Sequence, residues 1–443
     1  MPATLRRLLP VLCAALAAGC TPSSGAPAAD GGPAAAPSAW SPASPPAQIA
    51  AAVLQGCQGA ARRGECLEKA LVTVLDSAGV DRAMAALLAM AASDGRVRTD
   101  GHELAHGIGI AAYRGPETVS ETFGRCTTDF QSGCYHGVIQ AYFSDGRGSG
   151  GVTPERLNAL CADYRGPERR WLEFQCAHGM GHGLMAVNAH HLLRALDACD
   201  LLVESFEKQA CWGGAFMENV VNATHPHLTA TTRAAADAHA GHGAGEGAAE
   251  AAAEESHDHA AGGHEGQAAG AEAFKALDRD EPLYPCTVVK EHHRRQCYLM
   301  QTSPILFFNG GDFTAASQQC LRAPADVQQT CFQSLGRDAN SWGAGNHRRG
   351  IRYCAAAPPE WAPYCIVGLV KNIVDVTARP ADGLAFCRAV PDASKPACYR
   401  AVGQQIAVLH SVHASREREC RGAEVGFVPE CRTGTGLPLV RAE

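Results

Sequence analysis

The sequence predicts an all-α fold, arranged as a solenoid-like array of about ten αα-hairpin repeats that are each closed by a disulfide. Eighteen of the 20 cysteines fall into nine pairs whose members are 8 to 15 residues apart. In the C-terminal half, the second cysteine of each pair recurs at steps of 34, 34, 33 and 33 residues. Apolar residues after these cysteines recur every three or four positions, which is typical of one face of a helix.

The first element is an export signal at residues 1–20. Two arginines precede an apolar run over residues 8–18, which is too short to span a membrane and is typical of a signal peptide. The stretch LAAGC resembles a bacterial lipoprotein cleavage site, which implies that Cys20 is lipidated. Because Thr21 follows it instead of Asp, we expect a periplasmic protein anchored to the outer membrane. A plain secreted protein is the alternative.

The next segment, residues 21–48, consists almost entirely of Ala, Pro, Ser and Gly. Such a segment cannot bury a hydrophobic core, so we expect a disordered tether. The chain as a whole carries a net charge of −7 and contains no basic cluster. This charge distribution excludes nucleic acid as an expected partner.

Helical repeats are expected on both sides of an insertion, at 49–221 and at 275–443. In each repeat, a segment such as LLRALDAC ends at the first cysteine, and a second helix such as CIVGLVKNIVDV begins at the second one. Since exported chains with an even number of cysteines form disulfides, pairing between neighbours is the simplest choice, although other pairings stay open. The hairpin resembles Sel1-like and TPR repeats in length and form, but it lacks their consensus residues and so implies no ligand. The expected pairs are Cys57/Cys66, Cys126/Cys134, Cys161/Cys176, Cys199/Cys211, Cys286/Cys297, Cys320/Cys331, Cys354/Cys365, Cys387/Cys398 and Cys420/Cys431.

The insertion at 222–274 is rich in Ala, Gly, Glu and His, and its low complexity predicts disorder. Its composition resembles the His-rich loops of periplasmic zinc-uptake and nickel-handling proteins, which implies a metal-scavenging segment. An alanine-rich spacer with incidental histidines is the alternative. The histidines concerned are His225, His227, His239, His242, His257, His259 and His264.

Five further histidines form the main candidate site. His102 and His106, like His178 and His182, are four residues apart and should share a helix face. His136 and His178 each follow the second cysteine of their repeat by two residues. His102 stands two residues after Asp100, where the period places the cysteine missing from one repeat. We therefore expect three neighbouring helices to direct His102, His106, His136, His178 and His182 toward one metal site.

Several chemistries are open to this site. The string HELAH matches the H-E-x-x-H motif of zinc proteases, in which Glu103 would activate a zinc-bound water and Glu121 would be a third ligand. Alternatively, an imidazole-rich centre suits zinc, iron or copper for redox or oxygen chemistry, with Glu103 or Glu218 as an extra ligand or an outer partner. Haem b with two axial histidines is a variant of this reading. Haem c does not fit, because no C-x-x-C-H string occurs.

Two further hypotheses involve no catalysis. The histidines could capture and buffer zinc, copper or nickel, or the array could be a scaffold whose C-terminal repeats bind another periplasmic protein. We prefer a metalloenzyme, because buffering alone would need only the His-rich insertion. The glycines near the five histidines indicate close approach either to a neighbouring helix or to a cofactor. They are Gly107, Gly137, Gly179, Gly181 and Gly183.

Overall fold

The computed structural model describes residues 40–115, 119–145, 152–224 and 274–437. These residues form 21 α-helices and a few short 3₁₀ turns, without a β-strand among them, so the all-α prediction is confirmed. Cys20 and the seven histidines of the insertion lie outside the described residues, as do the signal peptide and residues 21–39 of the predicted tether. No helix of the described part is long and apolar enough to cross a membrane.

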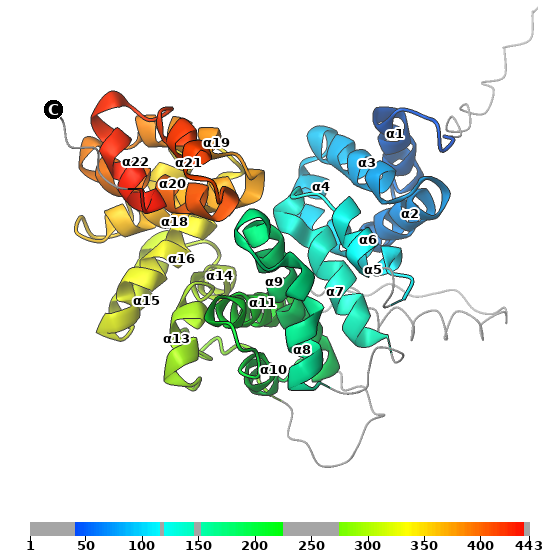
Figure 1. Cartoon of the computed structure of the whole chain (residues 1–443), viewed down its shortest axis with the longest axis horizontal. Coiled ribbons are helices and arrows are strands. Elements are labelled where there is room, and N and C mark those ends of the chain that lie inside the picture. The colour runs from blue at the N-terminus through cyan, green and yellow to red at the C-terminus, as the bar shows by residue number, and fades with distance from the viewer. Residues whose placement is uncertain (1–39, 116–118, 146–151, 225–273, 438–443) are drawn as a thin grey trace, which may run out of the picture. The chain divides into compact units, whose positions relative to one another are not determined.

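The helices follow one another in the colour order of Figure 1. Before the insertion they are α1 (Pro46–Gly56), α2 (Arg63–Ala78), α3 (Val80–Ser93), α4 (Gly95–Thr99), α5 (Gly101–Ala112), α6 (Val119–Arg125), α7 (Gly133–Ser144), α8 (Pro154–Leu160), α9 (Arg170–Val187), α10 (Leu192–Cys199) and α11 (Ser205–Thr224). After it they are α13 (Glu291–Tyr298), α14 (Thr302–Phe308), α15 (Phe313–Arg322), α16 (Ala325–Gly343), α17 (His347–Cys354), α18 (Ala362–Thr377), α19 (Pro380–Ala389), α20 (Lys395–Leu409), α21 (His413–Cys420) and α22 (Val428–Thr435).

Two predicted boundaries move by a few residues. Helix α1 begins at Pro46, inside the range assigned to the tether, because a proline at the first helical position has a suitable φ and needs no hydrogen-bond donor there. Helix α11 runs to Thr224, into the range assigned to the insertion. The helical part of the chain is therefore slightly longer on both sides than the composition indicated.

All nine neighbouring cysteine pairs form disulfides, with Cα–Cα distances of 5.4 to 5.8 Å. In eight of the nine pairs the first cysteine lies in the last turn of a helix or directly after it, as Cys199 does in α10, whereas Cys286 lies in a turn before α13. The prediction that the second cysteine opens the next helix is wrong in detail. Cys176 lies six residues inside α9, and Cys297 lies in the last turn of α13. The residues before Cys176, RWLEFQ, are compatible with a helix, so the helix extends toward the disulfide loop.

Close contacts at glycines join the helices in pairs. In the pair α9–α11, a Cβ atom on Gly181 would overlap the backbone carbonyl of Cys211, and one on Gly214 would overlap that of His178. Only glycine lets two helix backbones touch in this way. The same reciprocal contact occurs in α5–α7, α16–α18 and α20–α22, at Gly109/Gly137, Gly336/Gly368 and Gly403/Gly434.

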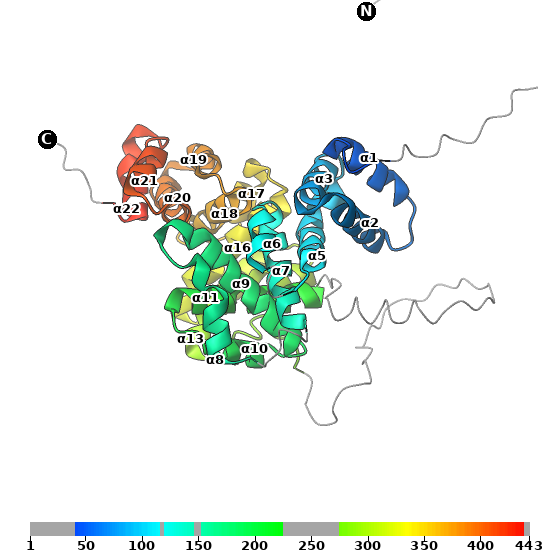
Figure 2. The same cartoon turned by 45° about the vertical axis from the view of Figure 1, so that its right-hand side comes forward.

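The five glycines near the histidines that the sequence analysis singled out all approach a neighbouring helix. Gly107, Gly179 and Gly183 likewise face side chains or backbone of neighbouring helices. Helices α7, α9 and α11 are consecutive neighbours in both views (Figure 1, Figure 2). The glycines bring these backbones close enough for side chains of three helices to meet at one point.

Candidate metal centre

The five predicted histidines gather at the junction of α5, α7 and α9. The ring centroid of His136 lies 4.7 Å from that of His178 and 4.9 Å from that of His182. His102 joins them at 5.5 Å from His136, and His106 at 5.6 Å from His182. Four of the five side chains are buried, with at most 8% of their surface exposed, and His102 is half-buried.

These separations suit ligation of one ion by several rings. A nitrogen–metal bond of about 2.0–2.1 Å puts a ring centre roughly 3.2 Å from the ion, so two ligating rings at right or tetrahedral angles have centres about 4.6–5.3 Å apart. The distances among His136, His178 and His182 are 4.7, 4.9 and 5.2 Å. The ligand atoms of these three residues also lie within 4.8 Å of one another. They could hold a metal ion.

Three of the rings already have an oxygen acceptor for one nitrogen. His102 Nδ1 lies 2.9 Å from the carbonyl oxygen of Phe130, and His136 Nε2 lies 3.1 Å from Gln175 Oε1. His182 Nδ1 lies 2.8 Å from Glu218 Oε2. A nitrogen that faces an oxygen carries the proton, so the second nitrogen of each ring keeps its lone pair. This arrangement is typical of metal-binding histidines and their outer partners.

The electrostatic environment keeps these imidazoles neutral. Burial lowers the pKa of His136 and of His178 well below the usual value, and the neighbouring histidines add to the effect. Burial, with a contribution from His102, lowers the pKa of His182 to about 3. A neutral imidazole is the form that coordinates a metal. The three rings are therefore ready to bind a cation at pH 7 without first losing a proton.

The register within the cluster differs from the prediction in one respect. The carbonyl that approaches the glycine of the next helix belongs to His106 in α5 and to His178 in α9. His106, and not His102, therefore occupies the position of His178. The missing cysteine then corresponds to Leu104 and not to Asp100. The cysteine period misplaced the missing cysteine because the connection from α5 to α7 has a different length from the others. The glycine contact gives the correct alignment of the helices.

The predicted carboxylates have different surroundings. Glu218 is fully buried beside His182. Glu121 is exposed on α6, where it pairs with Arg125 at 2.7 Å, and the structure does not bring it to the histidines. Glu103 lies on α5 between two of them, and its Oε2 is buried without a hydrogen-bond partner among the described residues. No described hydrogen bond joins Glu103 to the cluster.

A second group was missed by the sequence analysis. Asp200 accepts hydrogen bonds from His293 Nε2 at 2.9 Å and from Trp212 Nε1 at 3.0 Å, and His292 Nε2 lies 3.2 Å from its other oxygen. Asp200, His292 and His293 could hold a metal ion. Lys290 Nζ, at 3.5 Å from the same carboxylate, opposes a further cation there. The adjacent histidines were a visible signal, but their partner is about ninety residues away in sequence.

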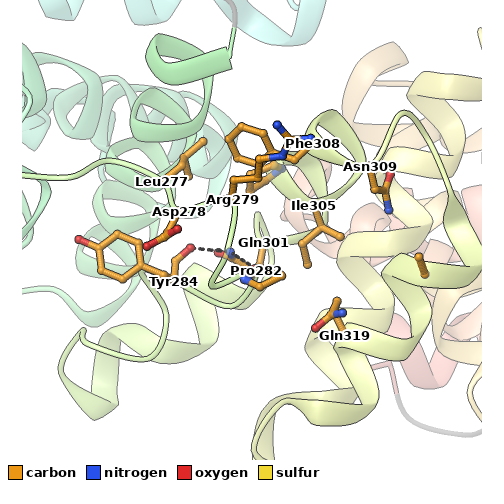
Figure 3. Close-up of a pocket in the computed structure, with 12 residues that line it drawn as sticks. Leu277, Asp278, Arg279, Pro282, Tyr284, Gln301, Ile305, Phe308, Asn309 and Gln319 are labelled. Carbon is orange, nitrogen blue, oxygen red and sulfur yellow. Dashed lines mark hydrogen bonds between the residues drawn. The ribbon is translucent and has the colours of Figure 1, made fainter. Parts of the chain in front are cut away.

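Two hollows lie near these elements. A cavity of about 370 Å³ has His136 and His178 in its wall, together with side chains of α9, α11, α13, α16 and α18. A smaller one, of about 160 Å³, lies between the loop before α13 and helices α14 and α15 (Figure 3). In it, Gln301 donates to the carbonyl groups of Pro282 and Tyr284, 2.8 Å away in both cases. Only the larger cavity reaches the histidines.

No model of a known protein family matches the chain, and no curated protein or solved structure matches it either. The function must therefore be argued from the site itself.

Proposed function

We propose that this protein is a metal-dependent enzyme whose metal ion is held by His102, His106, His136, His178 and His182. One observation carries the proposal, namely the convergence of five imidazoles from three helices, three of which have one nitrogen held by an oxygen acceptor. Buried imidazoles without such a purpose are rare as a group, because each polar ring must be desolvated. An ion would satisfy the remaining nitrogens together.

The number of imidazoles favours a redox-active metal. Zinc takes four ligands in structural sites and three protein ligands in catalytic ones, so five imidazoles exceed what one zinc ion needs. Iron, copper and nickel accept imidazole and bind more ligands in square or octahedral geometries. We therefore place oxygen or electron-transfer chemistry before hydrolysis. A zinc hydrolase with Glu103 as its base is the alternative, which the HELAH string favours.

The protein residues would divide the work between binding and access. Glu218 and Gln175 would orient the rings of His182 and His136, as outer partners of metal ligands do. His136 and His178 alone border the large cavity, so a molecule in that cavity would reach the ion from their side. The remaining ligands would close the other side of the ion from water.

The decisive measurement is the metal content and absorption spectrum of the protein produced with its export signal and with residues 225–264 deleted. We expect one or two tightly bound equivalents, which fall by at least one in the double variant His136→Ala/His178→Ala. The matched control is His292→Ala, which removes a histidine from the Asp200 group and should leave that content unchanged. A metal-free and colourless parent protein after reconstitution with iron, copper, nickel or zinc would overturn the proposal.

We also propose that the four glycine-joined helix pairs are copies of one unit, in keeping with the predicted solenoid-like array. The support is the identical placement of the contacts. On the first helix of each pair, the residue whose carbonyl is contacted and the glycine that makes the other contact are three residues apart. An experimental structure should let the backbone of α5–α7 superpose on that of α9–α11 and of α16–α18. Different crossing geometries in these pairs would contradict a common unit.

Export and lipidation of Cys20 remain part of the proposal. The nine disulfides support folding in an oxidising compartment, because such bonds are rare in reducing cytoplasm. The fatty acid would then hold the enzyme at a membrane surface.

A further inference from the structure

The large cavity that His136 and His178 border also carries positive charge in its wall. Arg295 of α13, Arg337 of α16 and Lys371 of α18 line it, and Asp375 is the only carboxylate among the described lining residues. Arg337 is engaged by Asp338 at 2.8 Å and contacts Ser303. Arg295 and Lys371 form no ion pair within 4.0 Å in the described part of the chain. Neither cation is therefore held in a salt bridge, and Asp375 is the one carboxylate of the described lining that acts on Lys371.

The two cations act on each other. Burial lowers the pKa of Lys371, Asp375 raises it, and repulsion by Arg295 lowers it further. Lys371 and Asp375 are four residues apart on α18, on one face of the helix. Asp375 accepts a hydrogen bond from Gln405 of α20. A carboxylate placed between Arg295 and Lys371 would remove the repulsion between them, and both side chains donate strong charge-assisted hydrogen bonds.

An aromatic row in the same cavity ends at His178. The ring of Trp171 stacks on that of Phe174 at 6.1 Å, and Phe174 stacks on His178 at 5.5 Å, with interplanar angles of 27° in both cases. All three rings line the cavity. Trp171 Nε1 is buried without a hydrogen-bond partner among the described residues. Flat apolar groups stack favourably on such surfaces.

The volume is sufficient for a small organic molecule. Ligand pockets typically measure about 300–1,000 Å³ and combine apolar walls with a few polar groups that fix orientation. The cavity, at about 370 Å³, lies at the lower end of this range. Its cationic wall and its aromatic row are carried by different helices, so a ligand that uses both must have an anionic head and an apolar body.

We infer that the cavity binds an organic carboxylate with a flat, aromatic body, whose carboxylate lies between Arg295 and Lys371 and whose body lies along Trp171 and Phe174, toward His136 and His178. That this molecule is the substrate rests on the proposed metal centre. Its binding does not, because none of the residues that would hold it is a proposed metal ligand.

The test is calorimetric titration of the full chain, freed of metal by a chelator, with phenylacetate as the probe. Phenylacetamide has the same body without charge, acetate has the charge without the body, and inorganic phosphate is a different anion. We expect one phenylacetate per chain, bound at least tenfold more tightly than any of the other three. Equal binding of phenylacetamide would overturn the role of the cations, and equal binding of phosphate would overturn that of the aromatic row.

Variants locate the site. Arg295→Met and Lys371→Met should each weaken phenylacetate binding at least tenfold. Arg294→Met is the matched control, because the neighbouring Arg294 faces Asp326 at 3.9 Å and does not line the cavity, and it should change the affinity less than twofold. Lys371→Gln is a second, polar replacement at the same position, in case Lys371→Met does not fold. Thermal unfolding verifies that each variant folds. Parental affinity in both cation variants would overturn the inference.

The metal content of each sample, measured before the chelator is added, separates this inference from the proposed function. If the chain holds metal but does not bind phenylacetate, the carboxylate site is refuted and the metal centre stands. If phenylacetate binds and the two cation variants weaken it while no metal is retained, the carboxylate site stands and the metalloenzyme is refuted.

Discussion

Three rings of the candidate centre, those of His102, His136 and His182, combine a nitrogen that faces an oxygen acceptor with a second nitrogen that keeps its lone pair. In His182, Nδ1 faces the buried carboxylate of Glu218 at 2.8 Å, while Nε2 is buried and has no hydrogen-bond partner among the described residues. A carboxylate that accepts the ring proton fixes the tautomer and makes the other nitrogen a better donor to a metal. Glu218 would therefore act on a bound metal through His182.

Glu218→Gln should weaken metal binding without abolishing it. The amide still fits the space, but it loses the negative charge, so we expect an affinity about 10–100-fold lower. Competition with a chromogenic chelator measures the change. Glu121→Gln is the control, because Glu121 is exposed and, among the described residues, pairs only with Arg125. The metal affinity of this variant should equal that of the parent. An unchanged affinity in Glu218→Gln would show that Glu218 only fills space beside His182.

The binding of phenylacetate should weaken as the pH rises through about 7. The side chain of Asp375 is exposed to solvent and lines the cavity, and desolvation by the protein atoms around it raises its pKa to about 7, against the opposing effects of Lys371 and Gln405. Below this pH the protonated carboxyl is neutral, and above it a second negative charge stands beside Lys371 and competes with the ligand for that cation. Arg295, the other cation near Lys371, keeps its charge throughout. Calorimetric titrations between pH 5.5 and 8.5 (roughly 1.5 units either side of the midpoint) measure the effect.

Asp375→Asn supplies the comparison for this pH dependence. The variant should bind phenylacetate at pH 8.5 about as well as the parent does at low pH, and its affinity should vary little over the range. If parent and variant follow the same pH curve, Asp375 is not the group that titrates.

The sequence identified the five histidines but not everything that orients them. Spacing of four residues and the position after the second cysteine are local signals, and they found all the rings that meet. The acceptors Gln175 and the Phe130 carbonyl could not be predicted, because they are fixed by how α9 and the turn before α7 pack. Glu218 was recognised only as one of several nearby carboxylates. Local pattern reveals which residues can bind, and packing decides which partner each one receives.

At the scale of the helix, glycine determines how close the histidines come. Gly137 of α7 faces the backbone of His106, so the crossing of α5 and α7 and the position of His106 depend on the same contact. The C-terminal pair α20–α22 has the equivalent contact between Gly434 and Arg400, far from the histidines in sequence. The two pairs allow packing and metal binding to be separated.

Gly137→Ala should reduce both stability and metal affinity. Its Cβ would overlap a backbone carbonyl, which cannot move as a side chain does, and overpacking of this kind costs about 1–3 kcal/mol. Gly434→Ala should lower the free energy of unfolding by a similar amount and leave the metal affinity unchanged. Gly124→Ala, on α6, is the control, because nothing lies within 4 Å of the added atom, and it should be neutral or slightly stabilising. Denaturant unfolding and chelator competition provide both values.

An unaffected metal affinity in Gly137→Ala, with stability reduced as expected, would mean that the histidines do not depend on the helix crossing. The period of the cysteines predicted the helices themselves, but not these pairs. The cysteine period of about 34 residues predicted single hairpins, whereas the position of the contacting glycine alternates between the first and the second helix of each pair and so marks helices that touch two by two. The alternation was present in the sequence, and its meaning required the knowledge of which backbones touch.

For the whole molecule, the sequence could not predict the large cavity. The helices before and after the insertion meet because α18 contacts the turn at Phe130–Ser132 and α20 contacts α9. These contacts join segments more than two hundred residues apart. Lys371 and Asp375 gave no signal of their own, since a lysine and an aspartate four residues apart are usually a solvent-exposed pair. Only the contacts between the two parts of the chain place them in the cavity that His136 and His178 border.

The disulfides also predict how the whole molecule depends on its compartment. Each closes a loop of only 8 to 15 residues, and each such bond stabilises a fold by about 2–4 kcal/mol. Several of the helices that they join have only seven or eight residues, too few to be stable alone. We expect the chain to be unfolded and unable to hold metal when it is produced in a reducing cytoplasm without residues 1–20. The exported chain should show no free thiol in denaturant.

Cys20→Ala in the exported chain should keep the disulfides and the metal but lose the attached lipid and the membrane association, as measured by mass spectrometry and fractionation. A reduced cytoplasmic chain with a native helical circular-dichroism spectrum would show that packing alone maintains the array, and an exported chain without lipid on Cys20 would leave the protein secreted and unanchored.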